Sequence, residues 1–212
     1  MAEGLELAGV RIQRNGAALV GLDHHVRPGE VLTVMGPSGV GKSTLLAFVT
    51  GTLSSDFSAT GEVRLDGVDI THLPPERRRV GILFQDDLLF PHLSVADNLA
   101  FGLAPEGSRS ARRAKVEAAL ADIELAGFGP RDPATLSGGQ KARVALMRML
   151  LAEPQALLLD EAFSGLDASL RTQMRDLVFG RARRLNLPVL MVTHDADDAT
   201  AAGGPVVELT GR

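Results

Sequence analysis

The sequence predicts an α/β fold in which a core of buried strands carries a glycine-rich loop and is interrupted by a helical insertion. Short apolar runs that suit buried strands occur at residues 31–35, 80–84, 156–159 and 187–192. A glycine-rich turn follows the first run and precedes a helical pattern. From residue 86 to about residue 151 the apolar positions recur at helical spacing. Together these features indicate one core with a helical insertion.

The amino-terminal part is predicted to contain mostly strands. Residues 5–12, 17–26 and 61–65 suit the strands of an antiparallel edge. Residues 31–35 form a buried strand in this prediction, and a helix over 43–50 follows the glycine-rich turn. Strand, loop and helix in that order give the context that a phosphate-binding loop needs.

The helical insertion and the remaining core follow in order. Ser94 can cap a helix over 94–101, and a second helix is predicted over 110–124. A loop at 127–130 precedes a third helix from 138 to 151. Beyond the insertion the prediction is strands at 156–159 and 187–192, separated by a helix over 168–185, with a terminal strand at 205–209.

Composition narrows the class of protein. The chain has 212 residues, enough for one domain with a substantial core, and 45% of them are hydrophobic. A formal net charge of −4 argues against a nucleic-acid binder, so no nucleic-acid partner is expected. No cysteine is present, which fits a reducing compartment. The start of the chain does not resemble a secretion signal, and the apolar runs are too short to span a bilayer.

Residues 36–44 match the phosphate-loop pattern G-x-x-x-x-G-K-[ST]. The candidate ATP-binding residues are Gly36, Pro37, Ser38, Gly39, Val40, Gly41, Lys42, Ser43 and Thr44. Glycines let backbone N–H groups turn toward phosphate oxygens, and the following helix presents its positive end. Lys42 would reach the β- and γ-phosphates, and the Ser43 hydroxyl would bind Mg²⁺. The alternative, a chance glycine turn, is disfavoured by the apolar strand before it.

Asp160 and Glu161 end the apolar run at 156–159. Asp160 would hold Mg²⁺, and Glu161 would polarise the water that attacks the γ-phosphate. A carboxylate pair after a strand is usually only a favourable start for the next helix. The phosphate loop upstream favours the catalytic interpretation.

A second candidate anion site is formed by Ser137, Gly138, Gly139 and Gln140, the Ser-Gly-Gly-Gln segment. It combines a hydroxyl, backbone that can be approached closely, and the start of a helix. Alone, the segment could be a serine cap with flexible glycines. It lies some twenty residues before the Asp160–Glu161 pair, and this position favours a functional role.

The order of these three motifs resembles the ATP-binding cassette (ABC) family of transporter ATPases. In that family the Ser-Gly-Gly-Gln segment grips the γ-phosphate of ATP bound to the other subunit of a dimer. The resemblance implies a role in hydrolysis for Gln85, which reaches Mg²⁺ and the attacking water, and for His194, which contacts the γ-phosphate. It implies a role in signalling across the dimer for Asp167. The other histidines, His24, His25, His72 and His92, have no metal-ligand spacing.

One position departs from the family pattern. Members usually place an aromatic side chain under adenine in the part that corresponds to residues 12–16, and this chain has no Tyr or Trp at all. Arg14 could stack its guanidinium on the base instead.

The resemblance covers nearly the whole chain and implies a P-loop NTPase core (RecA-like) with an antiparallel β edge and an inserted helical subdomain. We therefore expect residues 1–212 to form a single ABC ATPase domain, with residues 1–85 and 152–212 as the catalytic core and 86–151 as the helical subdomain. A C-terminal regulatory domain of the maltose or polyamine type is not expected, because the chain ends soon after the last predicted strand.

Residues 84–103 resemble the region of bacterial importer ATPases that receives a helix of the permease. Leu88, Leu89, Phe90 and Pro91 are the candidates for permease docking, with ordinary core packing as an equal alternative. With residues 74–79 the region is most similar to thiamine-type importer ATPases. The resemblance implies an ATP-dependent homodimer using ATP and Mg²⁺ and bound to an integral membrane permease at the cytoplasmic side of the bacterial inner membrane. It also implies an extracytoplasmic solute-binding protein.

Other functions share parts of this pattern. The main rival is the ATPase of an exporter or of a lipoprotein-extraction system, because its cassette chemistry is the same. A soluble ABC protein acting on ribosomes or DNA would carry two cassettes or a coiled-coil insertion. A small-molecule kinase needs no Ser-Gly-Gly-Gln segment, and a non-catalytic regulator could lose Glu161 or His194. The sequence does not disclose the transported solute.

Overall fold

The computed structural model describes residues 3–210 and contains two β-sheets. One sheet is antiparallel, in the order β2-β1-β4-β5. Its strands are β1 (Leu5–Arg14), β2 (Ala17–Val26), β4 (Phe57–Leu65) and β5 (Val68–Asp69). The β1–β2 hairpin turns at Asn15 and Gly16, which both have positive φ.

The second sheet is parallel, in the order β6-β7-β8-β3-β9. Its strands are β6 (Val80–Phe84), β7 (Ala156–Asp160), β8 (Val189–Thr193), β3 (Val31–Met35) and β9 (Val206–Glu208). Because the strands are parallel, their carboxyl ends share one edge of the sheet, where ligands of open α/β sheets bind. Phe84 pairs with Asp160, and Met35 pairs with Thr193.

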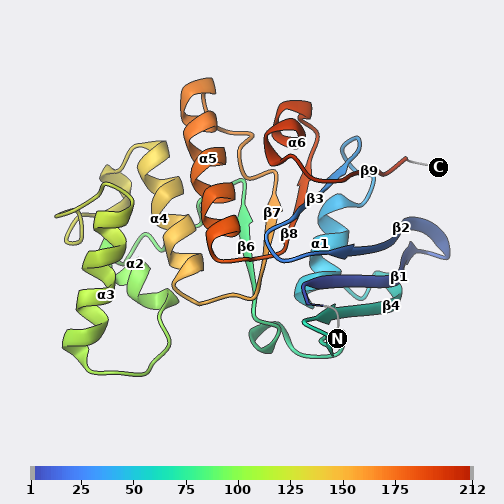
Figure 1. The fold of residues 1–212 in the computed structure, drawn as a ribbon, viewed down its shortest axis with the longest axis horizontal. Coiled ribbons are helices and arrows are strands. Elements are labelled where there is room, and N and C mark those ends of the chain that lie inside the picture. Colours follow the sequence, from blue (N-terminus) through green and yellow to red (C-terminus); the bar gives the residue numbers. More distant parts are fainter. Residues whose placement is uncertain (1–2, 211–212) are drawn as a thin grey trace.

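Six α-helices and two 3₁₀-helices complete the described residues. The helices are α1 (Lys42–Thr50), α2 (Val95–Gly102), α3 (Arg109–Asp122), α4 (Gly138–Leu150), α5 (Ala168–Arg184), α6 (Ala196–Ala202), η1 (Pro75–Arg77) and η2 (Pro133–Thr135). Figure 1 shows α2, α3 and α4 at one end of the molecule, the antiparallel sheet at the other end, and the parallel sheet between them. Among the described residues, none of the helices combines the length and apolar character needed to cross a bilayer.

The strands of the parallel sheet alternate between two hydrophobic cores. Leu158 and Leu190 join the core that contains α1 and the antiparallel sheet. Their neighbours Leu157 and Val189 join the core formed with α4 and α5. Successive strand residues point to opposite faces, so a sheet covered on both faces needs apolar side chains at every position. This explains why the strand sequences are continuous apolar runs.

A third hydrophobic core lies within the helical end and is built from α2, α3 and α4. Leu99, Leu120 and Val144 are fully buried there. Leu89 packs against both this core and the core around α4 and α5. The helical end therefore has its own apolar centre, with Leu89 at the junction.

The α1 helix is fixed at its far end by a buried arginine. The Arg78 guanidinium donates to the carbonyls of Phe48 and Val49 in the last turn of α1 and to Leu73 O. Burial lowers the pKa of Arg78, although the charge of Asp69 opposes this. A cation is well placed at the negative end of a helix. The anchor fixes the helix whose other end follows the phosphate loop.

The structure confirms the predicted α/β class, with its antiparallel edge and inserted helices. The strands predicted at 5–12, 17–26, 31–35 and 80–84 are present, and β4 begins earlier than expected, at Phe57. The sequence analysis did not find β5 or α6. Both are short, so they carry too little periodicity to be recognised. The division of the chain at residues 85/86 and 151/152 stays a prediction.

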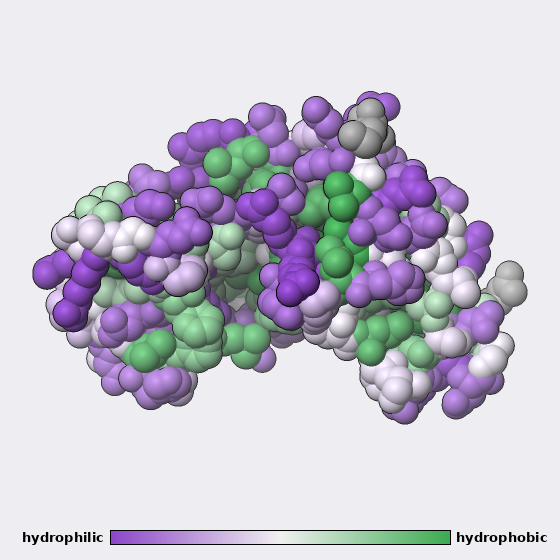
Figure 2. All heavy atoms as spheres, turned by 90° about the horizontal axis from the view of Figure 1, so that it is seen from below, coloured by the Kyte–Doolittle hydropathy of each residue, from purple (hydrophilic) through white to green (hydrophobic). Residues whose placement is uncertain are grey.

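The surface mixes polar and apolar groups. In Figure 2 the apolar groups gather in patches, one of them at the helical end, and the outline is notched between the helical end and the antiparallel sheet. The large apolar side chains that remain exposed include Phe84, Leu88 and Phe101.

Candidate functional site

The phosphate loop joins β3 to α1 at the carboxyl edge of the parallel sheet. Gly41 has φ +109°, and a Cβ there would lie 2.6 Å from Val20 Cγ2. Gly36 has φ +154°, and a Cβ there would lie 2.7 Å from the Leu209 carbonyl oxygen. Only glycine satisfies both the backbone conformation and the close approach at these two positions.

The first turn of α1 has free donors. Gly41 is the N-cap residue and offers no side-chain hydrogen bond to the helix. The amide groups at the start of a helix lack internal partners, so they are available to an anion. Lys42 Nζ donates to Gly36 O at 2.8 Å and to Pro37 O at 3.1 Å. The lysine is only 5% exposed, so a positive charge is fixed under the loop.

Asp160 ends β7 beside the start of α1. The Ser43 hydroxyl donates to Asp160 Oδ1 at 3.1 Å. Burial raises the pKa of Asp160, and the nearby charge of Glu161 adds to the rise, while the Ser43 hydrogen bond and the charge of Lys42 oppose it. Two of the three residues predicted to bind Mg²⁺, Ser43 and Asp160, are therefore in direct contact.

Glu161 lies between two other predicted site residues, Lys42 and His194. Its Oε1 is 3.6 Å from Lys42 Nζ, and its Oε2 is 3.2 Å from His194 Nδ1. Its backbone has φ +48°, the left-handed region that L-residues rarely adopt. Such strain is retained at functional sites when the surrounding structure enforces it. The carboxylate is thereby placed in contact with both the phosphate-loop lysine and the histidine at the end of β8.

A partly buried polar network supports the backbone next to His194. Arg171, on α5, donates to Asp195 Oδ2 at 2.6 Å and to the carbonyls of Ser164 and Leu166. Burial opposes the charge on Asp195, but backbone donors and the guanidiniums of Arg171 and Arg175 lower its pKa. This network was not predicted from the sequence. Its signal was the aspartate directly after His194.

Gln85 faces the same edge of the sheet. Together with Ser43, Asp160 and Glu161 it lines a cavity of about 250 Å³. Within the described residues no group of three or more His, Cys, Asp or Glu side chains has metal-binding geometry. The hydroxyl, amide and carboxylate oxygens that converge here are nevertheless the ligands that Mg²⁺ prefers, with phosphate oxygens and water completing its octahedron. The residues present fit a Mg²⁺ ion bound together with a nucleotide.

The Ser-Gly-Gly-Gln segment forms the start of α4. Ser137 Oγ accepts from Gln140 N at 3.3 Å, and Gln140 Oε1 accepts from Ser137 N at 2.9 Å, a complete capping box. A Cβ on Gly139 would lie 2.5 Å from Leu170 Cδ1, whereas a Cβ on Gly138 would meet nothing within 4 Å. Between residues 3 and 210, no hydrogen bond or ion pair joins this segment to the phosphate loop or to Glu161.

Asp167 and Arg14 have local partners. Asp167 caps α5 by accepting from Leu170 N at 3.0 Å. The Arg14 guanidinium lies 5.5 Å from the centre of the Phe57 ring, which it faces across the β1–β4 pair. Phe57 is an aromatic side chain that the sequence analysis did not place beside Arg14. The pairing of β1 with β4 was the missing information.

The candidates for permease docking divide between surface and core. Leu88 is 56% exposed, whereas Leu89 packs inside. The Phe90 ring lies 4.7 Å from the ring of Phe101, which is 68% exposed and was missed in the sequence analysis. Leu88, Leu89 and Pro91 also line a cavity of about 350 Å³ with Lys141. Leu89 thus takes part in core packing, Leu88 is left exposed, and permease docking stays a prediction.

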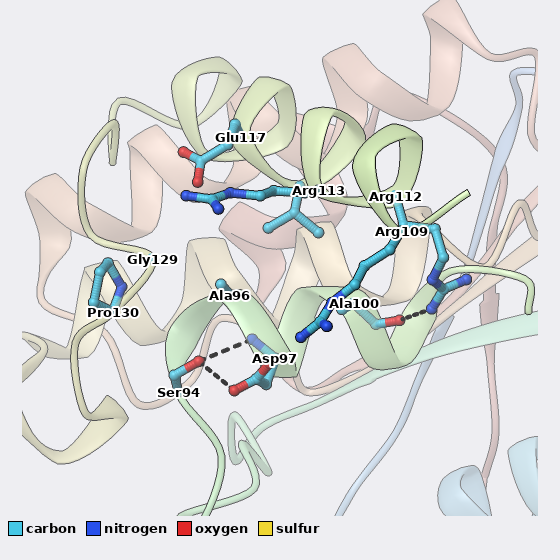
Figure 3. A pocket seen from close by; sticks show the side chains of 11 residues that line it. Ser94, Ala96, Asp97, Ala100, Arg109, Arg112, Arg113, Glu117, Gly129 and Pro130 are labelled. Carbon is cyan, nitrogen blue, oxygen red and sulfur yellow. Dashed lines mark hydrogen bonds between the residues drawn. The ribbon is translucent and has the colours of Figure 1, made fainter. Parts of the chain in front are cut away.

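A separate cavity of about 360 Å³ lies between α2 and α3 (Figure 3). Asp97 and Glu117 line it together with three arginines, Arg109, Arg112 and Arg113. Arg112 donates to the Ala100 carbonyl, and Ser94 bonds Asp97. None of the predicted site residues lines this cavity, and its charges are mixed.

The strand–loop–helix geometry, with a buried lysine under the loop and two carboxylates beside it, defines the class of P-loop nucleoside triphosphatases. Within that class, the family described as "ABC transporter" matches residues 19–164. The chain belongs to this family, whose ATPases bind and hydrolyse ATP.

The chain is similar to named relatives. It is 50% identical, over 86% of its length and 84% of the relative's, to the uncharacterized ABC transporter ATP-binding protein YnjD of Escherichia coli K12. It is 43% identical to a sulfate/thiosulfate import ATP-binding protein of Chromobacterium violaceum, over 86% of this chain and 49% of the relative. For an Fe(3+) ions import ATP-binding protein of Agrobacterium fabrum the identity is 42%, over 90% of this chain and 53% of the relative. The chain thus spans about half the length of these two importer relatives.

A solved structure gives the same picture of the fold. It is that of cbiO1 from Clostridium perfringens, described as part of the ABC transporter complex cbiONQ. The TM-score is 0.85 at 28% identity, over 99% of this chain and 86% of that one. The predicted ABC ATP-binding domain, with homologues of importer type, is therefore confirmed. The thiamine assignment stays a prediction.

Proposed function

We propose that this chain is the ATP-hydrolysing subunit of a bacterial importer and that it drives a solute through a separate membrane permease. The observation that carries the hydrolytic part is the contact of Glu161 with both Lys42 and His194. The import direction rests on relatives whose names describe the import of sulfate/thiosulfate, Fe(3+) ions and spermidine/putrescine.

The phosphate loop would bind the nucleotide. Backbone amides of residues 36–44 and the free first turn of α1 would receive the phosphates, and Lys42 would exchange its carbonyl partners for the β- and γ-phosphate oxygens. Ser43 and Asp160 would hold Mg²⁺, with Gln85 at the same cavity. The ion supplies charge neutralisation between the β- and γ-phosphates when bound.

Glu161 would act as the general base. Its carboxylate accepts the proton of the attacking water, and His194, on its other side, holds the carboxylate in place and contacts the γ-phosphate. Arg171 and Asp195 would position His194 through the backbone that follows β8. Arg14, supported by Phe57, would take the place of an aromatic side chain against adenine.

The Ser-Gly-Gly-Gln segment would act on a second copy of the chain. Its Ser137 and Gly138 are exposed at the start of α4, and within residues 3–210 the segment has no hydrogen bond or ion pair to the phosphate loop of its own subunit. In a head-to-tail homodimer this segment would meet the γ-phosphate held by the partner subunit, with Asp167 at the same interface. Two ATP molecules would then close the dimer, and hydrolysis would reopen it.

The exposed apolar side chains of Phe84, Leu88 and Phe101 would contact the permease. On this proposal the subunit would lie peripherally on the cytoplasmic side of the inner membrane, with an extracytoplasmic solute-binding protein in the same system. Specificity for the solute would reside in the permease and the binding protein.

Glu161→Gln tests the dimer mechanism. The amide retains the shape of the side chain but cannot accept the proton, so we expect hydrolysis to fall at least about 100-fold, a loss of some 3 kcal/mol of transition-state stabilisation. ATP should remain bound, and light scattering should report a stable dimer with Mg-ATP. Glu117→Gln, at an exposed position on α3, is the matched control. An ATP-loaded Glu161→Gln protein that stays monomeric would contradict the mechanism.

A further inference from the structure

Arg148 connects α4 to the chain that follows Gln85, here called the 86–91 segment. From the last turns of α4, its Nη1 donates to Leu88 O at 2.9 Å and its Nη2 to Asp87 O at 3.3 Å. The same guanidinium lies 5.1 Å from the centre of the Phe90 ring. One side chain thus contacts three residues of the segment, Asp87, Leu88 and Phe90.

The α2 helix also holds the segment, through Asn98. Asn98 is fully buried, accepts from Phe90 N at 2.8 Å, and donates to Phe90 O at 3.1 Å. Its Oδ1 is also 3.5 Å from Arg148 Nη1, so the two anchors touch. The side chains that hold the backbone of this segment therefore belong to the helical end of the molecule, although the segment continues directly from β6 of the core.

The segment adopts a conformation that needs such support. Leu88 has φ +46°, in the left-handed region, and its side chain is 56% exposed, so its own packing cannot hold it there. Cations of α4 also lie near the acidic side chain of Asp87 in this segment. Burial raises the pKa of Asp87, while Lys141 and Arg148, both on α4, oppose that rise.

The α4 helix connects the 86–91 segment, through Arg148, to the Ser-Gly-Gly-Gln segment. Ser137 caps the helix and Arg148 lies ten residues after its first residue, a span of roughly 15 Å along one rigid element. A displacement of the 86–91 segment that is carried by Arg148 therefore moves the Ser-Gly-Gly-Gln segment with it.

We propose that Arg148 is a positioning residue that couples the 86–91 segment to α4, so that a permease acting on the segment also moves the start of α4. The inference rests on the proposed function for the identity of the partner. Lysine cannot replace this arginine, because two divergent donors and a planar group that stacks on Phe90 are all required.

The first test needs the isolated subunit only. In Arg148→Lys we expect hydrogen exchange of peptides spanning residues 86–91 to accelerate about tenfold, since a bond from a charged donor is lost and the segment opens locally. Exchange in β6 and in the interior of α4 should not change. Arg143→Lys is the matched control, because Arg143 lies on the same helix but contacts Ile123, Glu124 and Gln173. Unchanged exchange at 86–91, or acceleration throughout the chain, would overturn the proposal.

The second test uses the subunit assembled with its permease in liposomes. Arg148→Lys should keep the basal hydrolysis and the ATP affinity of the free subunit, but the permease should stimulate its hydrolysis about tenfold less than that of the wild type. Arg143→Lys should keep the basal hydrolysis, the ATP affinity and the full stimulation. Full stimulation of Arg148→Lys would overturn the coupling. A wild-type subunit that no permease binds or stimulates would instead refute the proposed function, and the exchange experiment would still decide the role of Arg148.

Discussion

The starts of α1 and α4 are both candidate phosphate sites, but they are built differently. The start of α1 has a glycine N-cap in the left-handed region and no side-chain cap, and the first residue of the helix is the buried Lys42. The start of α4 has a complete capping box between Ser137 and Gln140, and its first glycine is exposed. One helix start presents free donors with a fixed charge, whereas at the other the Ser137 side chain already accepts from Gln140 N and the Gln140 side chain accepts from Ser137 N.

If both helix starts bind phosphate as proposed, this difference predicts that they do so under different conditions. The phosphate loop is organised for an anion by its own subunit, with no rearrangement of caps. At α4 an anion would have to compete with the Ser137 and Gln140 side chains, and caps of this kind contribute about 1 kcal/mol. A weak second site suits a contact that forms only when a partner subunit brings its nucleotide.

The largest effect is expected at the fixed charge. Lys42→Ala should lower ATP hydrolysis at least about 100-fold, because it removes the buried charge that lies under the loop, where the β- and γ-phosphates would bind. ATP affinity, measured by calorimetry on the isolated subunit, should fall as well. Lys115→Ala, which removes an exposed lysine on α3, should leave both quantities unchanged. Normal affinity in Lys42→Ala would show that the two helix starts differ less than their geometry suggests.

A smaller effect separates the two glycines at α4. Gly138→Ala should leave thermal stability and ATP affinity of the isolated subunit unchanged, since a Cβ there meets nothing within 4 Å. Its hydrolysis in the dimer should still fall about tenfold, because the methyl group would hold the backbone away from the partner's phosphate. Gly139→Ala should instead destabilise the fold by about 1–3 kcal/mol through contact with Leu170. If Gly138→Ala and the wild type hydrolyse ATP equally fast, the start of α4 does not act as a second phosphate site.

The smallest expected effect is a change in the free energy of unfolding, caused by the partly buried carboxylate of Asp160. Because burial raises its pKa, the folded state binds more protons than the unfolded state, and stability falls as pH rises from about 3.9 through the folded pKa. Asp160→Asn should therefore melt a few degrees higher than the wild type at neutral pH, with the difference shrinking toward acid pH. Thermal unfolding at several pH values measures this, with Asp56→Asn, at an exposed position, as control. A pH-independent difference would rule out ionisation as the cause.

Much of the fold could be predicted because its signals are local. An apolar run such as Val189–Thr193 predicts a strand, and a capping serine such as Ser94 predicts the start of a helix, without tertiary information. The three-residue strand β9 was also placed, since its residues continue an apolar pattern. The short helix α6 and the two-residue strand β5 depend on contacts with the rest of the chain, and the sequence does not encode these locally.

The candidate site likewise contains residues that local motifs predict and contacts that depend on the tertiary fold. Lys42, Asp160 and Glu161 belong to contiguous motifs and could be found by spacing. The pairing of Arg14 with Phe57 depends on strand register, and the contacts of Arg148 depend on how α4 packs beside the 86–91 segment. Such partners lie 43 to 61 residues apart, so no sequence pattern predicts them.

The left-handed backbone at Glu161 has a consequence for how this protein tolerates change. A non-glycine residue in that region costs about 1–2 kcal/mol, which glycine would not incur. Selection for heat tolerance and selection for turnover therefore have opposite preferences at position 161. A homologue adapted to high temperature has to find its extra stability elsewhere in the chain, because relaxing this residue would turn the carboxylate away from Lys42 and His194.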